Sequence, residues 1–119
     1  MCIRDRVMNG RSVILQASRK IPRVIRQVLA DRNVPAAAVN TFLMHQANQN
    51  LIDRVADSLT VDRARFYSNI RRYGNTSSAS LLIAASEWDT ECGFSSGRKV
   101  CLAAFGAGFH WGAMLAEGV

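Results

Sequence analysis

The run His45-Gln46-Ala47-Asn48 is the first place in the sequence where side chains of chemical interest cluster. It follows Thr41–Met44, a short apolar stretch typical of a buried strand. The end of such a strand would put the imidazole at the carboxyl edge of a sheet, where α/β proteins build their sites. Asn48 can cap a following helix, and a helix N-terminus disfavours a charged imidazole. His45 is therefore a candidate neutral hydrogen-bond donor; the alternative is a histidine satisfied by local capping.

A second cluster is Gly74-Asn75-Thr76-Ser77-Ser78. Its polar residues can simply cap the helix that follows, as Asn, Ser and Thr commonly do. In the functional interpretation, the Asn75 amide points at the same sheet edge as His45. Two neutral donors would then converge on one oxygen atom.

A third cluster surrounds Gly106-Ala107-Gly108 and is flanked by Phe105 and His110. Small residues let backbone N–H groups approach a substrate oxygen closely. An ordinary glycine-containing hairpin turn is the alternative. His110 is expected to be a surface or rim residue.

Helix-like and strand-like segments alternate along the chain. Apolar residues at helical spacing between Ile14 and Asn33 predict a first helix, which either begins near Pro22 or kinks there. The elements expected after it are a strand at Thr41–Met44, a helix after Asn48, a strand at Phe66–Ile70, a buried helix from Ala79 to about Trp88, and strands at Val100–Phe105 and Phe109–Leu115. This order predicts an α/β fold with a mixed, mostly parallel sheet whose last strand is antiparallel. No strand precedes the first helix, so the sheet would lack its first strand.

The composition favours one globular domain. Of the 119 residues, 49% are hydrophobic and 20% are charged, which is a folded rather than a disordered composition. No apolar run is long enough to cross a bilayer and the first residues show no secretory pattern, so we expect a cytoplasmic protein with no membrane partner. Cys2, Cys92 and Cys101 lack the spacing of a metal site or disulfide framework, and Cys101 is expected to be a buried hydrophobe.

The net charge of +6 favours polyanionic partners, such as phosphate-bearing substrates or an acidic carrier protein. A solvated, arginine-rich surface is the alternative. A nucleic-acid-binding module rests on charge alone, because the sequence has no RNA-binding aromatic motif, helix-turn-helix signature or basic stripe. We therefore expect no nucleic-acid partner.

In their order and spacing, the three clusters resemble β-ketoacyl-acyl-carrier-protein synthase III, a condensing enzyme of the thiolase fold. The resemblance also includes Met8-Asn9-Gly10 and the helix after it. It runs from about Val7 to Val119, so residues 7–119 would form the C-terminal half of such an enzyme. Residues 1–6 are not expected to be family sequence.

This resemblance implies roles for the clusters. His45 and Asn75 would be catalytic, holding the thioester oxygen of malonyl-carrier protein while it loses carbon dioxide in a decarboxylating Claisen condensation. The Gly106–Gly108 turn, chiefly the N–H of Ala107, would serve an oxyanion hole. Phe105 and Asn48 would line the substrate pocket. The substrates would be acyl-CoA and malonyl-acyl-carrier protein, with no cofactor and no metal.

The chain also departs from the family pattern. The nucleophilic cysteine lies in the N-terminal half of family members, and none of the three cysteines here fits it, so this chain alone is expected to be inactive. Basic residues that often contact the carrier protein are replaced by Asn50 and by Asp57-Ser58. Arg54, Arg71 and Arg72 are candidates to substitute for them in contacting a carrier protein or CoA.

The resemblance further implies partners: acyl carrier protein, acyl-CoA, the N-terminal half, and a second copy in a full-length homodimer. An exposed apolar face should mark where the N-terminal half packs. A synthase-III-like acyltransferase without decarboxylation and a non-catalytic subunit of a heteromeric synthase are the alternatives. The presence of both His45 and Asn75 favours condensation.

Overall fold

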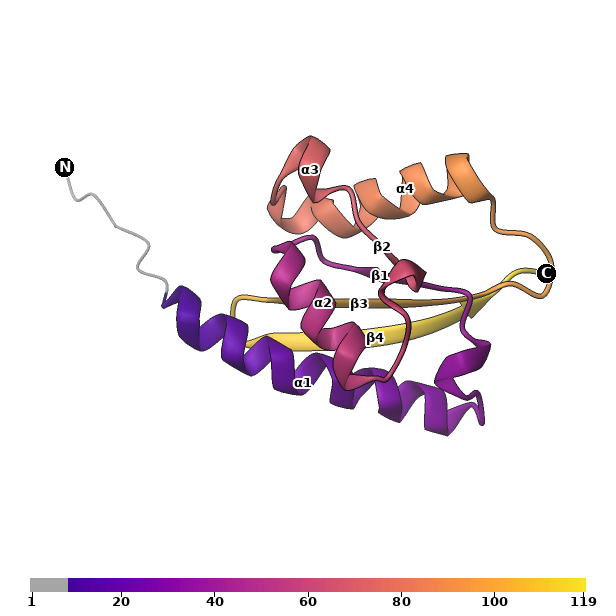
Figure 1. Ribbon diagram of the computed structural model, residues 1–119, viewed down its shortest axis with the longest axis horizontal. Helices are drawn as coiled ribbons and strands as arrows, with labels where there is room; N and C mark the ends of the chain where they lie inside the picture. Colours follow the sequence, from indigo (N-terminus) through magenta and orange to yellow (C-terminus); the bar gives the residue numbers. More distant parts are fainter. Residues whose placement is uncertain (1–8) are drawn as a thin grey trace.

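The computed structural model describes residues 9–119 and shows a sheet with helices on both faces (Figure 1). Its strands lie in the order β2-β1-β3-β4. In chain order the elements are α1 (Gly10–Asp31), η1 (Ala36–Ala38), β1 (Thr41–Met44), α2 (Gln49–Ser58), η2 (Arg63–Arg65), β2 (Phe66–Tyr67), α3 (Ile70–Tyr73), η3 (Ser77–Ala79), α4 (Ser80–Cys92), β3 (Lys99–Gly106) and β4 (His110–Glu117).

The sheet is mixed, as predicted from the order of the elements. Strand β1 is parallel to both of its neighbours, and its Leu43 lies opposite Tyr67 of β2 and Leu102 of β3. Strand β4 returns antiparallel to β3 through a hairpin. The carboxyl end of β1 therefore lies beside the hairpin end of β3, because the two strands run in the same direction.

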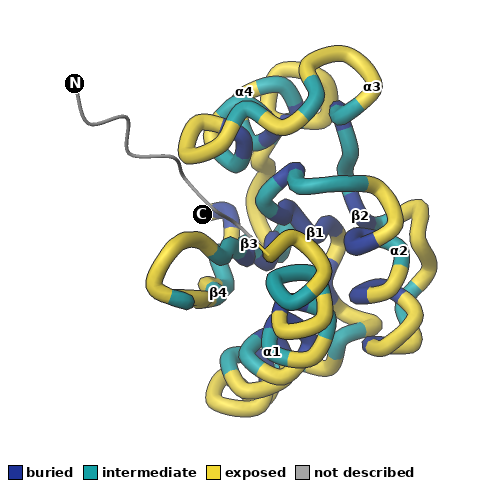
Figure 2. Tube along the Cα trace, turned by 90° about the vertical axis from the view of Figure 1, so that its left-hand side faces the viewer, coloured by how far each residue is buried: buried dark blue, intermediate teal, exposed yellow. Residues whose placement is uncertain are grey.

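The two faces of the sheet carry separate apolar clusters. All four residues of β1 are buried, and its side chains alternate between the faces. Phe42 and Met44 pack with the apolar stripes of α1 and α2, whereas Leu43 packs with Trp88 of α4. Figure 2 shows burial concentrated where α1 and α2 meet the sheet, with much of α4 exposed. The larger core thus lies under α1 and α2.

Helix α1 runs uninterrupted through Pro22, so of the two predicted alternatives, a helix start near that proline is wrong. It begins at Gly10, where the side chain of Asn9 accepts a hydrogen bond from the Ser12 N–H at 3.1 Å. A proline inside a helix removes one backbone hydrogen bond. Here Pro22 is buried against the core together with Ile21, and this packing offsets the loss. Among the described helices, none is both long enough and apolar enough to cross a membrane.

The strand predicted at Phe66–Ile70 is wrong beyond Tyr67. Strand β2 stops there, and Ile70 begins the short helix α3. The intervening Asn69 donates its backbone N–H to the Gln46 side chain at 3.1 Å and its side-chain amide to Glu87 at 3.0 Å. These two bonds draw the chain away from the ladder, because an N–H bonded to a side chain cannot also extend the sheet.

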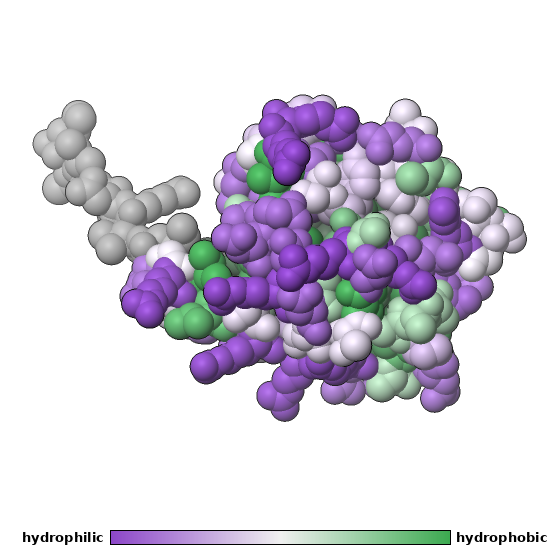
Figure 3. Space-filling view, viewed as in Figure 1, coloured by the Kyte–Doolittle hydropathy of each residue, from purple (hydrophilic) through white to green (hydrophobic). Residues whose placement is uncertain are grey.

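The prediction of a helix buried on nearly every side is wrong for α4. Its buried residues are Ser80, Ala84 and Trp88, which form a single stripe. Leu82 is 72% exposed, and Met114 of β4 is 57% exposed. Figure 3 shows apolar patches interrupting the polar surface on the face it displays. The described part of the chain therefore leaves apolar side chains in contact with solvent.

Candidate active site

His45 lies just beyond the end of β1, at the sheet edge where the sequence placed it. Its backbone N–H donates to the Ala103 carbonyl at 2.9 Å and so extends the ladder with β3 by one bond. Its ring Nδ1 contacts the hydroxyl of Ser80, the first residue of α4. The ring also packs edge-on against Phe105, with centroids 5.1 Å apart. Backbone, hydroxyl and aromatic contacts together fix the imidazole in one place.

Burial lowers the pKa of His45 below its usual value of 6.5. The physical cause is desolvation, which disfavours the charged imidazolium. A neutral imidazole has one nitrogen that donates a hydrogen bond and one that accepts. Near neutral pH, His45 is therefore an uncharged ring with a single N–H donor, and burial rather than the neighbouring helix start is the cause.

Gln46 connects the His45 segment to the chain that leads toward Asn75. Its side chain is fully buried. The Nε2 group donates to the carbonyls of Met44 at 2.8 Å and Tyr67 at 3.3 Å, and the Oε1 atom accepts from the Asn69 N–H at 3.1 Å. Both polar ends of the amide are used, so Gln46 joins the end of β1 to the segment before α3.

Asn75 lies in the turn between α3 and η3 and is exposed. The turn begins at Gly74, whose φ of +64° is a conformation that favours glycine. The side-chain oxygen of Asn75 accepts from the Ser77 N–H at 2.9 Å within the turn. The capping prediction is wrong, because no side chain of the described residues caps η3 or α4. Within residues 9–119 its amide NH2 has no protein partner. The oxygen is thus held while the donor end stays available.

The glycine turn joins β3 to β4, and it is shifted by one residue from the prediction. Strand β3 runs through Gly106, so the turn comprises residues 107–109 rather than 106–108. The strands are longer because their pairing continues to the Gly106–His110 pair. Gly108 has a φ of +145°, which favours glycine, and a Cβ there would also lie 2.0 Å from the exposed His110 ring.

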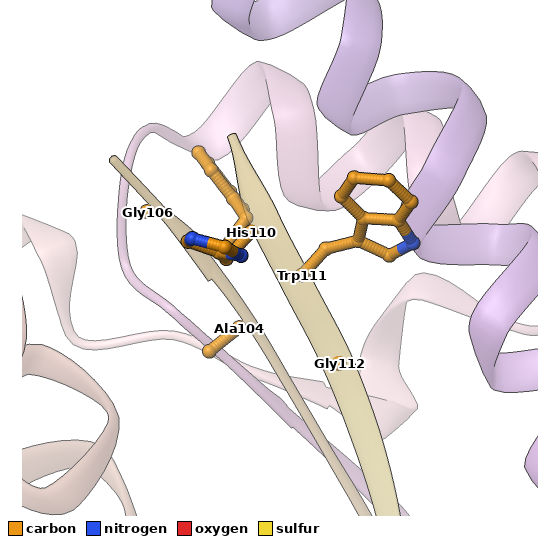
Figure 4. Close-up of a pocket in the computed structure, with 6 residues that line it drawn as sticks. Ala104, Gly106, His110, Trp111 and Gly112 are labelled. Atoms are coloured by element: carbon orange, nitrogen blue, oxygen red, sulfur yellow. The ribbon is translucent and has the colours of Figure 1, made fainter. Parts of the chain in front are cut away.

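A shallow hollow of about 280 Å³ lies on this hairpin (Figure 4). Its lining residues are Ala104, Phe105, Gly106, His110, Trp111 and Gly112. His110 and Trp111 project to opposite sides of β4, and the Trp111 ring lies under the ammonium of Lys20 at 3.8 Å. His45 is not among the lining residues, but its ring packs against Phe105, which is. Phe105 thus contacts the His45 ring and also lines the hollow. His110 is exposed, as predicted.

Two further residues predicted to contact substrate or partner, Asn48 and Arg54, lie at the start of α2 and on it. Asn48 caps α2, accepting from the Leu51 N–H at 2.8 Å, as predicted. Arg54 is exposed on α2 and borders a second hollow of about 460 Å³ with Arg11, Ile14 and Leu15.

The two arginines of α3 differ from each other. Arg72 pairs with Glu87 at 2.7 Å and with Glu91 at 3.4 Å. Arg71 is exposed, and no ion pair to it is seen within the described residues. Of the two, only Arg71 is therefore uncommitted.

The sequence analysis did not identify Ser80 as a contact of His45, nor the buried hydrogen bonds that the Gln46 side chain makes. Ser80 is 1% exposed and Gln46 is fully buried, although both are polar. The available signal was position: Ser80 is a polar residue at the start of an apolar helix, and Gln46 lies inside a motif already singled out. Buried polar residues are nearly always hydrogen-bonded, and both of these side chains are.

The described cysteines do not lie at a strand-to-helix turn. Cys101 is buried in β3, and burial raises its pKa to about 12. Cys92 is exposed at the end of α4, and Cys2 lies outside the described residues. A buried thiol with so high a pKa is protonated near neutral pH and is a poor nucleophile.

Comparisons with known proteins identify the family. A family model described as "3-Oxoacyl-[acyl-carrier-protein (ACP)] synthase III C terminal" matches residues 29–117. A β-ketoacyl-[acyl-carrier-protein] synthase III of Gloeobacter violaceus is 44% identical over 110 residues, which cover 92% of this chain and 33% of that protein. The chain spans about a third of the length of the curated relatives it matches.

Solved structures agree with the sequence matches. The synthase III of Thermus thermophilus superimposes with a TM-score of 0.91 at 31% identity, over 100% of this chain and 37% of that one. The enzyme of Aquifex aeolicus gives 0.88 at 36% identity, over 92% and 35%. The resemblance seen in the three motifs is confirmed, as is the thiolase-like fold class. This chain belongs to the 3-oxoacyl-[acyl-carrier-protein] synthase III family, and it corresponds to the C-terminal domain of that family.

Proposed function

We propose that this chain supplies the decarboxylating half of a Claisen condensing site, with His45 and Asn75 as its two hydrogen-bond donors. The observation that carries the proposal is the state of His45, a half-buried imidazole kept neutral by desolvation at the edge of the sheet. The free amide NH2 of Asn75 supports it, since its oxygen is occupied by the Ser77 N–H. Both groups can donate to an oxygen without carrying charge.

The chemistry follows from where charge develops. When a malonyl thioester decarboxylates, the bond to the carboxylate carbon breaks and its electron pair moves into an enolate, with negative charge on the thioester oxygen. Donors aimed at that oxygen stabilise the enolate more than the neutral ground state, and this difference accelerates the reaction. The enolate carbon then attacks an acyl thioester, forming a carbon–carbon bond and releasing a thiolate.

The acyl group would be carried by a cysteine of the N-terminal half. Cys101 is unsuited because it is buried with a raised pKa. The Ala107 N–H in the β3–β4 turn would donate to the acyl carbonyl oxygen, and Phe105 and Asn48 would border the space between the reacting groups. We expect the 119-residue chain alone to be inactive in condensation, because neither cysteine among the described residues lies at a strand-to-helix turn where it could carry the acyl group.

We propose acyl-CoA and malonyl-acyl-carrier protein as the substrates, with no cofactor. Support comes from the hollow between α1 and α2, where Arg11 and Arg54 flank the apolar Ile14 and Leu15. An apolar hollow with guanidinium groups at its border suits a flexible thioester arm that ends in phosphate. Arg71 is a further candidate for contact with an acidic carrier, whereas Arg72 is held by two glutamates.

We further propose that the N-terminal half packs against the exposed apolar side chains, among them Leu82 and Met114. These residues are 72% and 57% exposed in the described chain. Large apolar side chains left exposed can mark a docking surface. The full-length form is proposed to be a homodimer.

The test uses the full-length protein that carries this chain and follows release of carbon dioxide from a malonyl thioester. Either His45→Ala or Asn75→Ala should lower the decarboxylation rate by about 10²–10³-fold, the usual effect of removing one such donor. His110→Ala is the matched control and should leave the rate unchanged. A wild-type protein that accepts an acyl group yet leaves malonyl thioester intact would refute the proposal and favour an acyltransferase without decarboxylation. A protein with neither activity would favour a non-catalytic subunit.

A further inference from the structure

Ser80 is a buried serine in contact with the proposed donor His45. It is the first residue of α4 and is 1% exposed. Its Oγ atom accepts the backbone N–H of Gln46 at 3.1 Å and also contacts Nδ1 of His45. One hydroxyl therefore meets two consecutive residues of the segment that follows β1.

The direction of each bond follows from counting protons. A backbone amide can only donate, so Ser80 Oγ is the acceptor in its bond with Gln46. The hydroxyl carries one proton of its own, and within the described residues Nδ1 of His45 is its one remaining partner. A buried donor without an acceptor is costly. The hydroxyl therefore donates to Nδ1, which must then be unprotonated.

We propose that Ser80 is a positioning residue that holds His45 in the tautomer with its proton on Nε2. The inference rests on the proposed function for the identity of the oxygen that His45 binds. The tautomer itself is argued from the Ser80 contacts and does not depend on that function. With Nδ1 occupied by Ser80, the Nε2–H group is the end of the ring left to donate. The serine thus determines that the imidazole presents a donor rather than a lone pair.

The opposite tautomer conflicts with the same contacts. A proton on Nδ1 would make Ser80 accept from both His45 and Gln46, and the buried hydroxyl proton would have no partner. It would also leave a lone pair on Nε2, which repels an enolate oxygen. Phe105 packs edge-on against the ring, with an interplanar angle of 71°, and restricts its reorientation.

Nitrogen-15 NMR tests the tautomer directly. The sequence contains two histidines, so a chain labelled only at histidine gives two imidazole spin systems, which a His110→Gln variant assigns. The expected spectrum shows His45 protonated at Nε2 in the wild type, and a mixture of both tautomers in Ser80→Ala. Ser86→Ala is the matched control, since Ser86 is an exposed serine on the same helix. A wild-type His45 protonated at Nδ1, or a tautomer unchanged by Ser80→Ala, overturns the inference.

A second readout uses the pH profile of malonyl-thioester decarboxylation in the full-length protein. A donor to Nδ1 favours the neutral ring, so its removal should raise the pKa of His45 and move the acid limb of the profile to higher pH. We expect the rate at neutral pH to fall about tenfold in Ser80→Ala, in keeping with the loss of one buried hydrogen bond. Ser80→Thr keeps the hydroxyl and should restore the wild-type limb. A rate lowered equally at every pH would indicate a merely structural serine and overturn the inference.

The two readouts separate this inference from the proposed function. A wild-type protein with His45 protonated at Nε2 but no decarboxylation keeps the role of Ser80 and refutes the condensing function. A protein that decarboxylates with His45 protonated at Nδ1 keeps the function and refutes the role of Ser80.

Discussion

Replacing Gln46 with leucine should destabilise the fold far more than the same change at the surface. Leucine is close to glutamine in size, so Gln46→Leu removes the hydrogen bonds of a fully buried amide without opening a large cavity. The affected bonds connect the end of β1 to the segment that leads through α3 to Asn75. The variant therefore tests whether this link holds the candidate site together.

The expected loss follows from the three bonds. Asn69 is 4% exposed, and its N–H would lose its acceptor, the Oε1 atom at 3.1 Å. A buried amide left unpaired costs about 1–3 kcal/mol. The two bonds from Nε2, to Met44 and Tyr67, contribute about 1 kcal/mol each. The free energy of unfolding should fall by about 3–5 kcal/mol in total, a large part of the ~5–15 kcal/mol typical of a domain.

Urea denaturation followed by circular dichroism measures this difference. Gln27→Leu is the matched control, because Gln27 is exposed on α1 and its side chain, within residues 9–119, bonds only Asp31, at 3.2 Å. That change should alter the free energy of unfolding by about 0.5 kcal/mol or less. Unfolding of Gln46→Leu at the same urea concentration as Gln27→Leu would show that the Gln46 amide does not hold these segments together.

Three further predictions concern titration, reactivity and packing. The pKa of His45 is lowered from 6.5, so the unfolded chain binds more protons below that pH, and the free energy of unfolding should decrease as pH falls; a pH series with His45→Gln should show a smaller decrease. Mass spectrometry after brief alkylation near neutral pH should find Cys92 modified and Cys101 intact, since Cys101 is buried with a pKa of about 12; equal modification would contradict its burial. Ile25→Ala should cost about 2–5 kcal/mol, whereas Leu82→Ala, at a side chain 72% exposed, should cost well under 1 kcal/mol; similar midpoints in urea would count against the assigned core.

The alternation of apolar segments was sufficient to predict most of the fold. Helical spacing in α1 and the compact apolar run of β1 are local signals, and β1 formed at the expected residues, whereas α1 formed as a helix but began earlier than expected, at Gly10. The end of β2 was missed because it depends on Asn69, whose partners Gln46 and Glu87 are distant in sequence. The exposure of α4 was missed for a related reason. Composition shows that a helix is apolar, but not which of its faces this chain covers.

The residue types and local positions of the candidate site could be predicted from the sequence, but the hydrogen bonds that connect its segments could not. The position of His45 after a strand and the capping bond of Asn48 follow from local rules. The contact between His45 and Ser80 does not, because it joins two segments that only the tertiary fold brings together. Neither does the shift of the glycine turn, which depends on how far the pairing of β3 with β4 continues. Long-range hydrogen bonds are the part that sequence patterns leave unspecified.

A structure of the full-length protein bound to a stable malonyl-thioester analogue would show whether His45 and Asn75 hold the thioester oxygen. We expect Nε2 of His45 and the side-chain nitrogen of Asn75 both to lie about 2.7–3.2 Å from that oxygen. A thioester oxygen directed away from His45, or held by backbone groups alone while Asn75 faces solvent, would contradict these roles of the two residues.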